Sequence, residues 1–450
     1  MEINERMARR FWLLGLLGLV LAGLLVACGT NYNAGTDGLV VVGSQGSGLL
    51  QTFSFNLNTG SVAQVTNPTN LTANEICVLN GSPANMVMNP TGTYTYVIFN
   101  KSDQCPNATQ YGIATFKVNS DGTIAQVGNL VPDPNPIAMA MDPAGKFLFV
   151  AEGLSSTAVN NSMTQNTPCV QTQAVNGVCV YSIGSSGALT AVQSSYVLPP
   201  FPTTPNFVAL AASPTVFPQV GINGTQNAVC SIPGATPPTA QYLYLVDATN
   251  YQVLEFAVNT STGALGNPGV NPSQVFTFPT DKVPMGVAVD PCDRFVYVSD
   301  MLTNKVSGYV LCSVAILPTP CPYADGSLVP VPGSPFTMAG SVESPGPIVV
   351  DPFGNNVYVL GTLSDTVSPF KISPISGALS ALTPPTVATG QGPVSMTIRQ
   401  DDNWLFVANF GTGALGGNTV SQYSVTPATG ALTVLPAIQT DNSPFGVAVK

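Results

Sequence analysis

A short phrase recurs seven times along the chain and limits the fold more than any other feature. It consists of Ser, Thr or Asp, then Gly, a small residue, and finally Leu, Ile or Val. The copies are Thr59–Val62, Asp121–Ile124, Ser186–Leu189, Thr262–Leu265, Asp325–Leu328, Ser376–Leu379 and Thr429–Leu432. A repeat of roughly 50 residues is typical of propellers and related arrays, in which one small unit recurs many times. The chain is therefore predicted to be a repeat protein.

Each repeat reads as four short strands. A Pro-led apolar strand such as Pro136–Met141 is followed by a tight turn such as Asp142–Gly145. A second strand such as Phe295–Val298 alternates aromatic and aliphatic residues, which indicates burial between two sheets. After a variable loop and a third strand, the repeated phrase forms the hairpin to the fourth strand, because its Gly can take a positive φ. An eighth match, Thr412–Leu415, precedes the third strand Val420–Val425 and is assigned to a loop.

The two ends of the chain supply complementary parts of one repeat. The first repeat begins at a second-type strand, Leu39–Val42, whereas the chain ends with a Pro-led strand, Pro444–Val449. The last strand can therefore complete the first blade and remove the exposed edges of an open array. We predict an all-β fold over residues 38–450, a seven-bladed β-propeller whose first blade is closed by the C-terminal strand. An open β-solenoid is the alternative, but such an array would have no need to divide one repeat between the two ends of the chain.

Residues 1–28 are predicted to be an export signal. Three arginines precede an apolar run, Phe11–Val26, which is too short for a membrane span of ~20 residues. The run ends in Leu25–Cys28, which resembles a bacterial lipobox in which the Cys carries lipid. We expect Cys28 to anchor the protein in the membrane, residues 29–37 to form a tether, and the location to be the outer membrane or periplasm. An ordinary signal peptide is the alternative.

The remaining cysteines and the charge support export. Eight cysteines suit four disulfides in an oxidising compartment, namely Cys77–Cys105, Cys169–Cys179, Cys312–Cys321 and, by elimination, Cys230–Cys292. The chain has no His and no C-x-x-C motif, so a zinc site is not favoured. Its formal net charge of −10 argues against a nucleic-acid partner, because phosphate binding needs a basic surface.

Several strand and turn segments are similar to those of a known family. Asp290–Asp300, Asp351–Val359 and Leu405–Asn409 resemble the repeats of the YVTN-repeat and lactonase-like propellers, which include 6-phosphogluconolactonase-like proteins. The resemblance covers about residues 38–450. It implies a seven-bladed propeller and admits two kinds of relative, namely hydrolases of sugar lactones and exported proteins without an established reaction.

Polar side chains at the ends of the second strands are the candidate site. Read around the ring, these positions are Ser44, Phe99 with Asn100, Glu152, Asp247, Asp300, Gly361 and Asn409. The three carboxylates, from three consecutive blades, are predicted to hold Ca²⁺ or another divalent cation or to supply a general base. The alternative is that they only satisfy backbone groups of the turns. Arg294 and Arg399, the only arginines after residue 28, each precede a second strand and are expected on the opposite face.

Two hypotheses for function follow. The first is a binding or interaction scaffold at the cell envelope, with a protein or carbohydrate partner held by the long loops 154–177 and 213–239. The alternative is a lactone hydrolase, metal-assisted through Glu152, Asp247 and Asp300. Whether the protein is an enzyme stays open, because the sequence contains no nucleophile elbow between a strand and a helix, no P-loop and no dinucleotide-binding motif.

Overall fold

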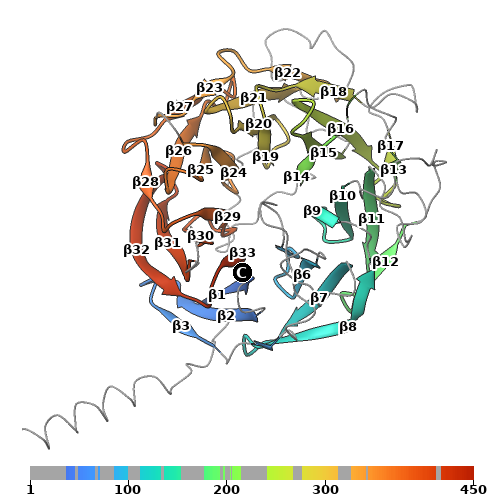
Figure 1. The fold of residues 1–450 in the computed structure, drawn as a ribbon, viewed down its shortest axis with the longest axis vertical. Coiled ribbons are helices and arrows are strands. Elements are labelled where there is room, and N and C mark those ends of the chain that lie inside the picture. Colours follow the sequence, from blue (N-terminus) through green and yellow to red (C-terminus); the bar gives the residue numbers. More distant parts are fainter. Residues whose placement is uncertain are drawn as a thin grey trace, which may run out of the picture.

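Seven antiparallel sheets surround a central axis in the computed structural model of this chain (Figure 1). The structure describes residues 37–45, 49–65, 69–70, 86–99, 112–132, 136–153, 177–192, 196–197, 203, 205–213, 241–266, 276–312, 326–340, 343–411 and 417–450. Within this part of the chain all regular secondary structure is β. The predicted seven-bladed propeller is therefore confirmed.

Blade 1 combines strands from both ends of the chain, and blades 2 and 3 follow it in the sequence. Blade 1 runs from the inside outward as β33 (Pro444–Val449), β1 (Asp37–Ser44), β2 (Leu49–Asn56) and β3 (Val62–Gln64), with β4 (Thr69–Asn70) also paired to β2. Blade 2 consists of β5 (Met86–Met88), β6 (Tyr94–Phe99), β7 (Gly112–Val118) and β8 (Ile124–Pro132). Blade 3 consists of β9 (Pro136–Met141), β10 (Phe147–Glu152), β11 (Gly177–Ile183) and β12 (Leu189–Ala191), with β13 (Tyr196–Val197) paired to β11.

Each of the other four blades is built from strands that are consecutive in the sequence. Blade 4 consists of β14 (Phe207–Ala212), β15 (Gln241–Asp247), β16 (Gln252–Val258), β17 (Leu265–Gly266) and β18 (Phe276–Pro279). Blade 5 consists of β19 (Pro284–Val289), β20 (Phe295–Asp300), β21 (Lys305–Leu311), β22 (Leu328–Pro330) and β23 (Phe336–Thr337). Blade 6 consists of β24 (Pro345–Val350), β25 (Asn356–Gly361), β26 (Thr366–Ile372), β27 (Leu379–Ala381) and β28 (Val387–Ala388). Blade 7 consists of β29 (Pro393–Ile398), β30 (Trp404–Asn409), β31 (Thr419–Thr426) and β32 (Ala431–Gln439).

The C-terminal strand closes the ring as predicted. β33 pairs with β1 in an antiparallel register that places Val40 opposite Val449 and Val42 opposite Val447. Each inner strand contacts the inner strands of its two neighbours, and the contact of β33 with β5 and β29 completes the circle (Figure 1). This closed arrangement excludes the open solenoid.

The repeated glycines adopt the left-handed conformation that the hairpin needs. Gly60, Gly122, Gly187, Gly263, Gly326, Gly377 and Gly430 all have positive φ, between 71° and 91°. Some of their carbonyl groups also join blades, because Tyr297 Oη donates to Gly377 O at 2.7 Å and Tyr358 Oη donates to Gly430 O at 3.0 Å. The repeated phrase is thus both a hairpin and an inter-blade joint. The eighth match lies outside the described residues.

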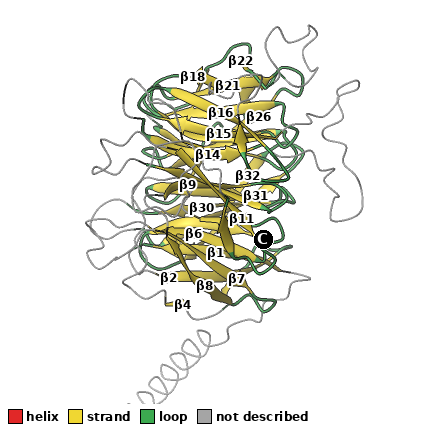
Figure 2. Ribbon diagram, turned by 90° about the vertical axis from the view of Figure 1, so that its right-hand side faces the viewer, coloured by secondary structure: helices red, strands yellow, loops and turns green. Residues whose placement is uncertain are grey.

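The hydrophobic core lies between the blades. Alternate residues of β20 face opposite neighbours, since Phe295 and Tyr297 pack with Val359 of blade 6, whereas Val298 packs with Val246 of blade 4. A second strand is therefore covered on both faces, as its alternating aromatic and aliphatic residues predicted. The side view shows the turns and loops at the two faces of the ring, beyond the strand ends (Figure 2).

Several sequence predictions fall largely outside the described residues. Cys28, most of the tether and nearly all of both long loops belong to this group. Among the described residues, Cys179, Cys292 and Cys312 are disulfide-bonded, and the other five predicted disulfide cysteines are not described, so the four pairings stay predictions. The described part of the chain has no helical segment with the length and apolar character of a membrane span.

Candidate functional site

The predicted carboxylates lie at one face of the ring, buried within the blades. Glu152, Asp247 and Asp300 end the second strands β10, β15 and β20, and we call this side the strand-end face. All three side chains are 0% exposed. Ser44, Gly361 and Asn409, at equivalent positions, are also buried, while the Phe99 side chain and Asn100 lie outside the description. The cause is the radial order of the strands, because the second strand of each blade packs between the two neighbouring blades.

Asp247 closes the turn of its own blade. Its Oδ1 accepts backbone hydrogen bonds from Asn206 and Thr249, both at 3.1 Å. Its Oδ2 accepts from Asn250 Nδ2 at 2.6 Å and from Gln252 Nε2 at 3.2 Å. This is the backbone-satisfying role that the sequence left open as the alternative.

Asp300 points outward to the third strand. Its Oδ2 accepts a hydrogen bond from Ser307 Oγ on β21 at 2.7 Å. Burial raises the pKa of Asp300 to about 7, against the opposing effect of the Ser307 hydrogen bond. Such a value suits a proton acceptor, but the side chain has no exposed surface through which to meet a substrate.

The three carboxylates do not assemble the metal site predicted from the sequence. The described residues contain no group of three or more His, Cys, Asp or Glu side chains that could hold a metal ion. Asp247 and Asp300 instead bind groups of their own blades.

A cavity of about 580 Å³ lies at the opposite face. In β9 the end at Met141 pairs with Leu148, whereas Pro136 pairs with Glu152, so the two ends of each inner strand reach opposite faces. We call the side with the turns after the inner strands the turn face. The turn-face cavity is bounded by β5, β9, β29 and β33 and by the turns that follow them. Its lining includes Met86, Met141, Met396, Asn89, Ser395, Asp142, Arg399, Asp401 and Lys450.

An ion pair forms one wall of this cavity. Arg399 follows β29, and its Nη1 contacts Asp401 Oδ2. Its Nε donates to the backbone oxygen of Lys450 at 3.0 Å, and Asp401 Oδ1 accepts from Asn403 N at 3.2 Å. The two side chains are 15% and 13% exposed, so the pair is held firmly while part of it still reaches the cavity.

Two other charged groups of the cavity have different surroundings. Asp142 is engaged by its own turn, since its Oδ1 accepts from the backbone N–H groups of Lys146 at 2.5 Å and Phe147 at 2.6 Å. Burial raises the pKa of Asp142, and these hydrogen bonds oppose the shift. The aliphatic part of Lys450 packs over Gly92, where an added Cβ would lie 2.6 Å from Lys450 Cδ. A glycine in the neighbouring blade therefore makes room for this cation.

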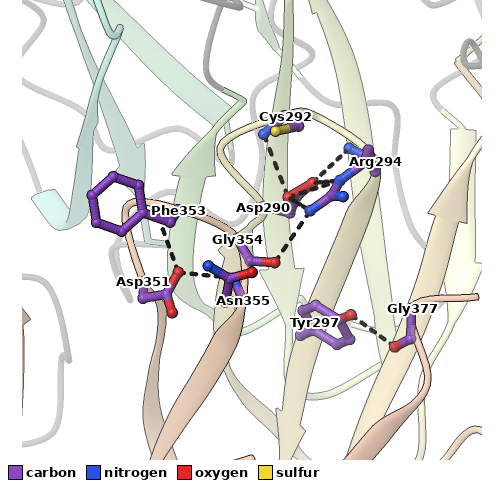
Figure 3. A network of polar contacts seen from close by, with 9 residues as sticks. All are labelled: Asp290, Cys292, Arg294, Tyr297, Asp351, Phe353, Gly354, Asn355 and Gly377. Carbon is purple, nitrogen blue, oxygen red and sulfur yellow. Dashed lines mark hydrogen bonds and ion pairs between the residues drawn. The ribbon is translucent and has the colours of Figure 1, made fainter. Parts of the chain in front are cut away.

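Arg294 shows what an arginine at another turn position of this face does away from the cavity. It lies on the turn face, like Arg399, as the sequence predicted, but it is 4% exposed and bound to Asp290, with 2.7 Å between Nε and Oδ2. Its Nη2 donates to Gly354 O of blade 6 at 3.2 Å (Figure 3). Burial opposes its charge, but the hydrogen bond and charge of Asp290 more than offset this, so the Arg294 pKa is raised. Arg294 thus joins two blades.

Comparison with known proteins places this geometry in context. No protein-family model matches the chain. It is 24% identical over 326 residues to a 6-phosphogluconolactonase of Serratia proteamaculans, covering 70% of this chain and 87% of that protein. A putative 6-phosphogluconolactonase from Bacteroides uniformis superposes with a TM-score of 0.62 at 17% identity, covering 92% of this chain and all of the other. A periplasmic gluconolactonase of Pseudomonas aeruginosa gives 0.61 at 16% identity, with 92% and 99% covered.

The chain has the fold of the 6-phosphogluconolactonase-like propellers. The fold expected from the resemblance is therefore confirmed. These relatives are named as lactonases, the activity that the sequence analysis gave as its alternative.

Sequence reasoning did not find the grouping of Arg399, Asp401 and Lys450 in this propeller. One signal was available, because most turns after inner strands begin with Asp or Asn followed by Pro, whereas blade 7 has Arg399 to Asp402 instead. A turn that departs from the repeated sequence need not serve the fold in the same way, so its side chains are candidates for function. Lys450 could not be assigned to this group from the sequence, because it reaches Arg399 only when β33 closes the ring.

Proposed function

We propose that the protein is a hydrolase of sugar lactones whose site is the turn-face cavity. One observation carries the proposal, namely the Arg399–Asp401 pair on the wall of a cavity at one end of the propeller axis. The lactonase names of its relatives support the same reaction. The cavity volume of about 580 Å³ falls in the usual range for small-molecule sites.

The pair offers the two groups that ester hydrolysis needs. Asp401 accepts a proton from a water molecule, which attacks the lactone carbonyl carbon. The guanidinium of Arg399 stabilises the negative charge that develops on the carbonyl oxygen. The tetrahedral intermediate collapses by breaking the ring C–O bond, and the leaving oxygen takes up the proton. The product is the open hydroxy acid, so one water is consumed for each ring opened.

The rest of the lining suits a sugar ring. Met86, Met141 and Met396 offer apolar contact to the carbon skeleton, and thioether side chains adapt to irregular shapes. Asn89 and Ser395 offer hydrogen bonds to ring hydroxyl groups. We further propose that the enzyme acts in the cell envelope, anchored by lipid on Cys28, as the lipobox-like segment Leu25–Cys28 suggests.

The test is hydrolysis of glucono-δ-lactone and related sugar lactones, with the uncatalysed rate subtracted. Arg399→Gln and Asp401→Asn are each expected to lower kcat/KM by about 100-fold, the usual loss when an oxyanion donor or a general base is removed. Parallel assays with calcium and with a chelator test the metal-assisted alternative that uses Glu152, Asp247 and Asp300.

The control is Lys117→Gln, which removes an exposed cation on β7 that does not line the cavity. It should retain full activity, and all variants should keep the wild-type melting temperature within a few degrees. Wild-type protein that opens no sugar lactone faster than buffer, or a fully active Arg399→Gln variant, overturns the proposal.

A further inference from the structure

Asp402 occupies an unusual place directly behind the proposed site. It ends the turn that carries Arg399 and Asp401, and its backbone N–H donates to Arg399 O at 2.9 Å. Its φ is 57°, a conformation that side chains other than Asn and Asp rarely adopt. The side chain is 0% exposed, and neither carboxylate oxygen has a hydrogen-bond partner among the described residues.

The turn itself does not require this carboxylate. The same turn position is Gly92 in blade 2, Gly145 in blade 3 and Gly354 in blade 6, with φ between 64° and 67°. Blade 5 has Asp293 there, also buried and with a φ of 54°. Asp293 faces the Ser213 hydroxyl of blade 4 and does not line the turn-face cavity. Of the two buried aspartates at this turn position, only Asp402 belongs to the turn that lines the cavity, so Asp293 is its matched control.

Most of the groups that face Asp402 oppose its ionisation. Asp351 and Asp401 are carboxylates, and Tyr358 of blade 6 lies close enough for the Asp402 charge to raise its pKa. Lys371 of β26 acts in the opposite direction. Asp351 is held in place by Asn356 Nδ2 at 2.6 Å and by two backbone N–H groups. A buried carboxyl without a hydrogen-bond partner, beside two other carboxylates, is most stable when it holds a proton.

We propose that Asp402 is a positioning residue whose neutral form leaves the Arg399–Asp401 pair intact and whose ionisation disables it. This inference rests on the proposed function. An ionised Asp402 would place a third negative charge behind the pair. Its charge would repel Asp401, the carboxylate that pairs with Arg399, and would so displace the pair from its working geometry.

The sign of the pH effect follows from the direction of the shift. Burial raises the pKa of Asp402 to about 8, with Asp351 and Asp401 adding to the shift. The proton is therefore present at neutral pH and is lost as the pH rises through about 8. Activity should fall on the alkaline side and recover when the pH is lowered again.

The first experiment measures kcat/KM between about pH 6 and pH 9.5, with the uncatalysed hydrolysis subtracted at each pH. Wild-type protein should lose about tenfold across the upper half of this range, as a single ionisation predicts. Asp402→Gly and Asp402→Asn, both compatible with a positive φ, should lose this alkaline decline, whereas Asp293→Gly should keep it. An unchanged decline in both Asp402 variants, or its loss in Asp293→Gly, overturns the inference.

The second experiment does not depend on activity. The chain has two tryptophans, so Trp12→Phe in the full chain leaves Trp404 as the only one. Trp404 follows Asp402 by two residues, is 5% exposed and packs edge-on against Phe55. Its fluorescence should change reversibly near pH 8 in this background, and Asp402→Gly should abolish the change while Asp293→Gly preserves it.

The two readouts separate the two proposals. A fluorescence transition that depends on Asp402, without any lactone hydrolysis, supports the titration of this turn and overturns the proposed function. Lactone hydrolysis that depends on Arg399, with no transition at Trp404 and no Asp402-dependent decline, supports the function and overturns the role of Asp402.

Discussion

Single glycines determine how neighbouring blades meet. In blade 6, Gly377 has a φ of 74°, accepts a hydrogen bond from Tyr297 and lies against Phe295 of blade 5. A Cβ at this position would lie 2.5 Å from Phe295 Cδ1. The residue is therefore restricted twice, by its own backbone and by the adjoining blade. Positions of this kind explain why the repeated phrase is so uniform and why it reveals nothing about chemistry.

Gly377→Ala is expected to lower the free energy of unfolding by about 2–4 kcal/mol, because backbone strain and overpacking add at one site. Urea denaturation monitored by far-UV circular dichroism measures the change. Gly266→Ala in β17 is the control, since it has no positive φ and a Cβ there would meet nothing within 4 Å. Equal effects of the two substitutions on the free energy of unfolding would contradict a special role for Gly377 in the contact between blades 5 and 6.

At the scale of elements, the closing strand has two tasks. β33 covers the inner edge of β1, and its neighbour Lys450 supplies the carbonyl oxygen that holds Arg399 Nε. Lys450 also brings a cation to the turn-face cavity. Closure of the ring and completion of the candidate site are therefore one event in the folded protein.

A chain that ends at Ser443 should neither close the ring nor hold Arg399. Loss of β33 exposes the edge of β1, which favours association between molecules. We expect aggregation in size-exclusion chromatography, a broad thermal transition and no lactone hydrolysis above background. The control is Val434→Ala in the outer strand β32. The Val434 side chain is 59% exposed, so this variant should behave as wild type. A monomeric truncated chain with a normal thermal transition would show that closure is dispensable.

In the whole molecule, the first strand, β1, starts on the same face of the ring as the cavity, and the predicted lipid anchor precedes this strand in the sequence. β1 starts at Asp37, opposite Asn56 and close to the pairing of Leu39 with Lys450. This is the turn face, on which the cavity opens. A lipid on Cys28 would therefore be tied to the cavity side of the ring by the short segment between residues 29 and 36.

Cys28→Ser is expected to abolish labelling by radioactive palmitate and to move the protein from the membrane to the soluble envelope fraction. Gly29→Ala, next to the predicted lipid-bearing residue, should stay labelled and serves as the control. Persistent labelling of Cys28→Ser would refute the lipid anchor without affecting the propeller or its site.

The blade count, the position of each hairpin and the closure by Pro444–Val449 could all be predicted from the amino-acid sequence. These features are local, because turns depend on Gly and Pro at given spacings and strands on an alternation that can be read directly. Even the split first blade follows from counting parts of the repeat.

The places of the polar side chains could not be predicted in this way, because they depend on how the blades pack. Glu152, Asp247 and Asp300 occupy equivalent places in the repeat, but radial stacking buries them between blades instead of around the axis. Arg399 and Lys450 are separated by 51 residues and meet because the ring closes. Repetition encodes the scaffold one unit at a time, whereas a site depends on contacts between units, which no single repeat contains.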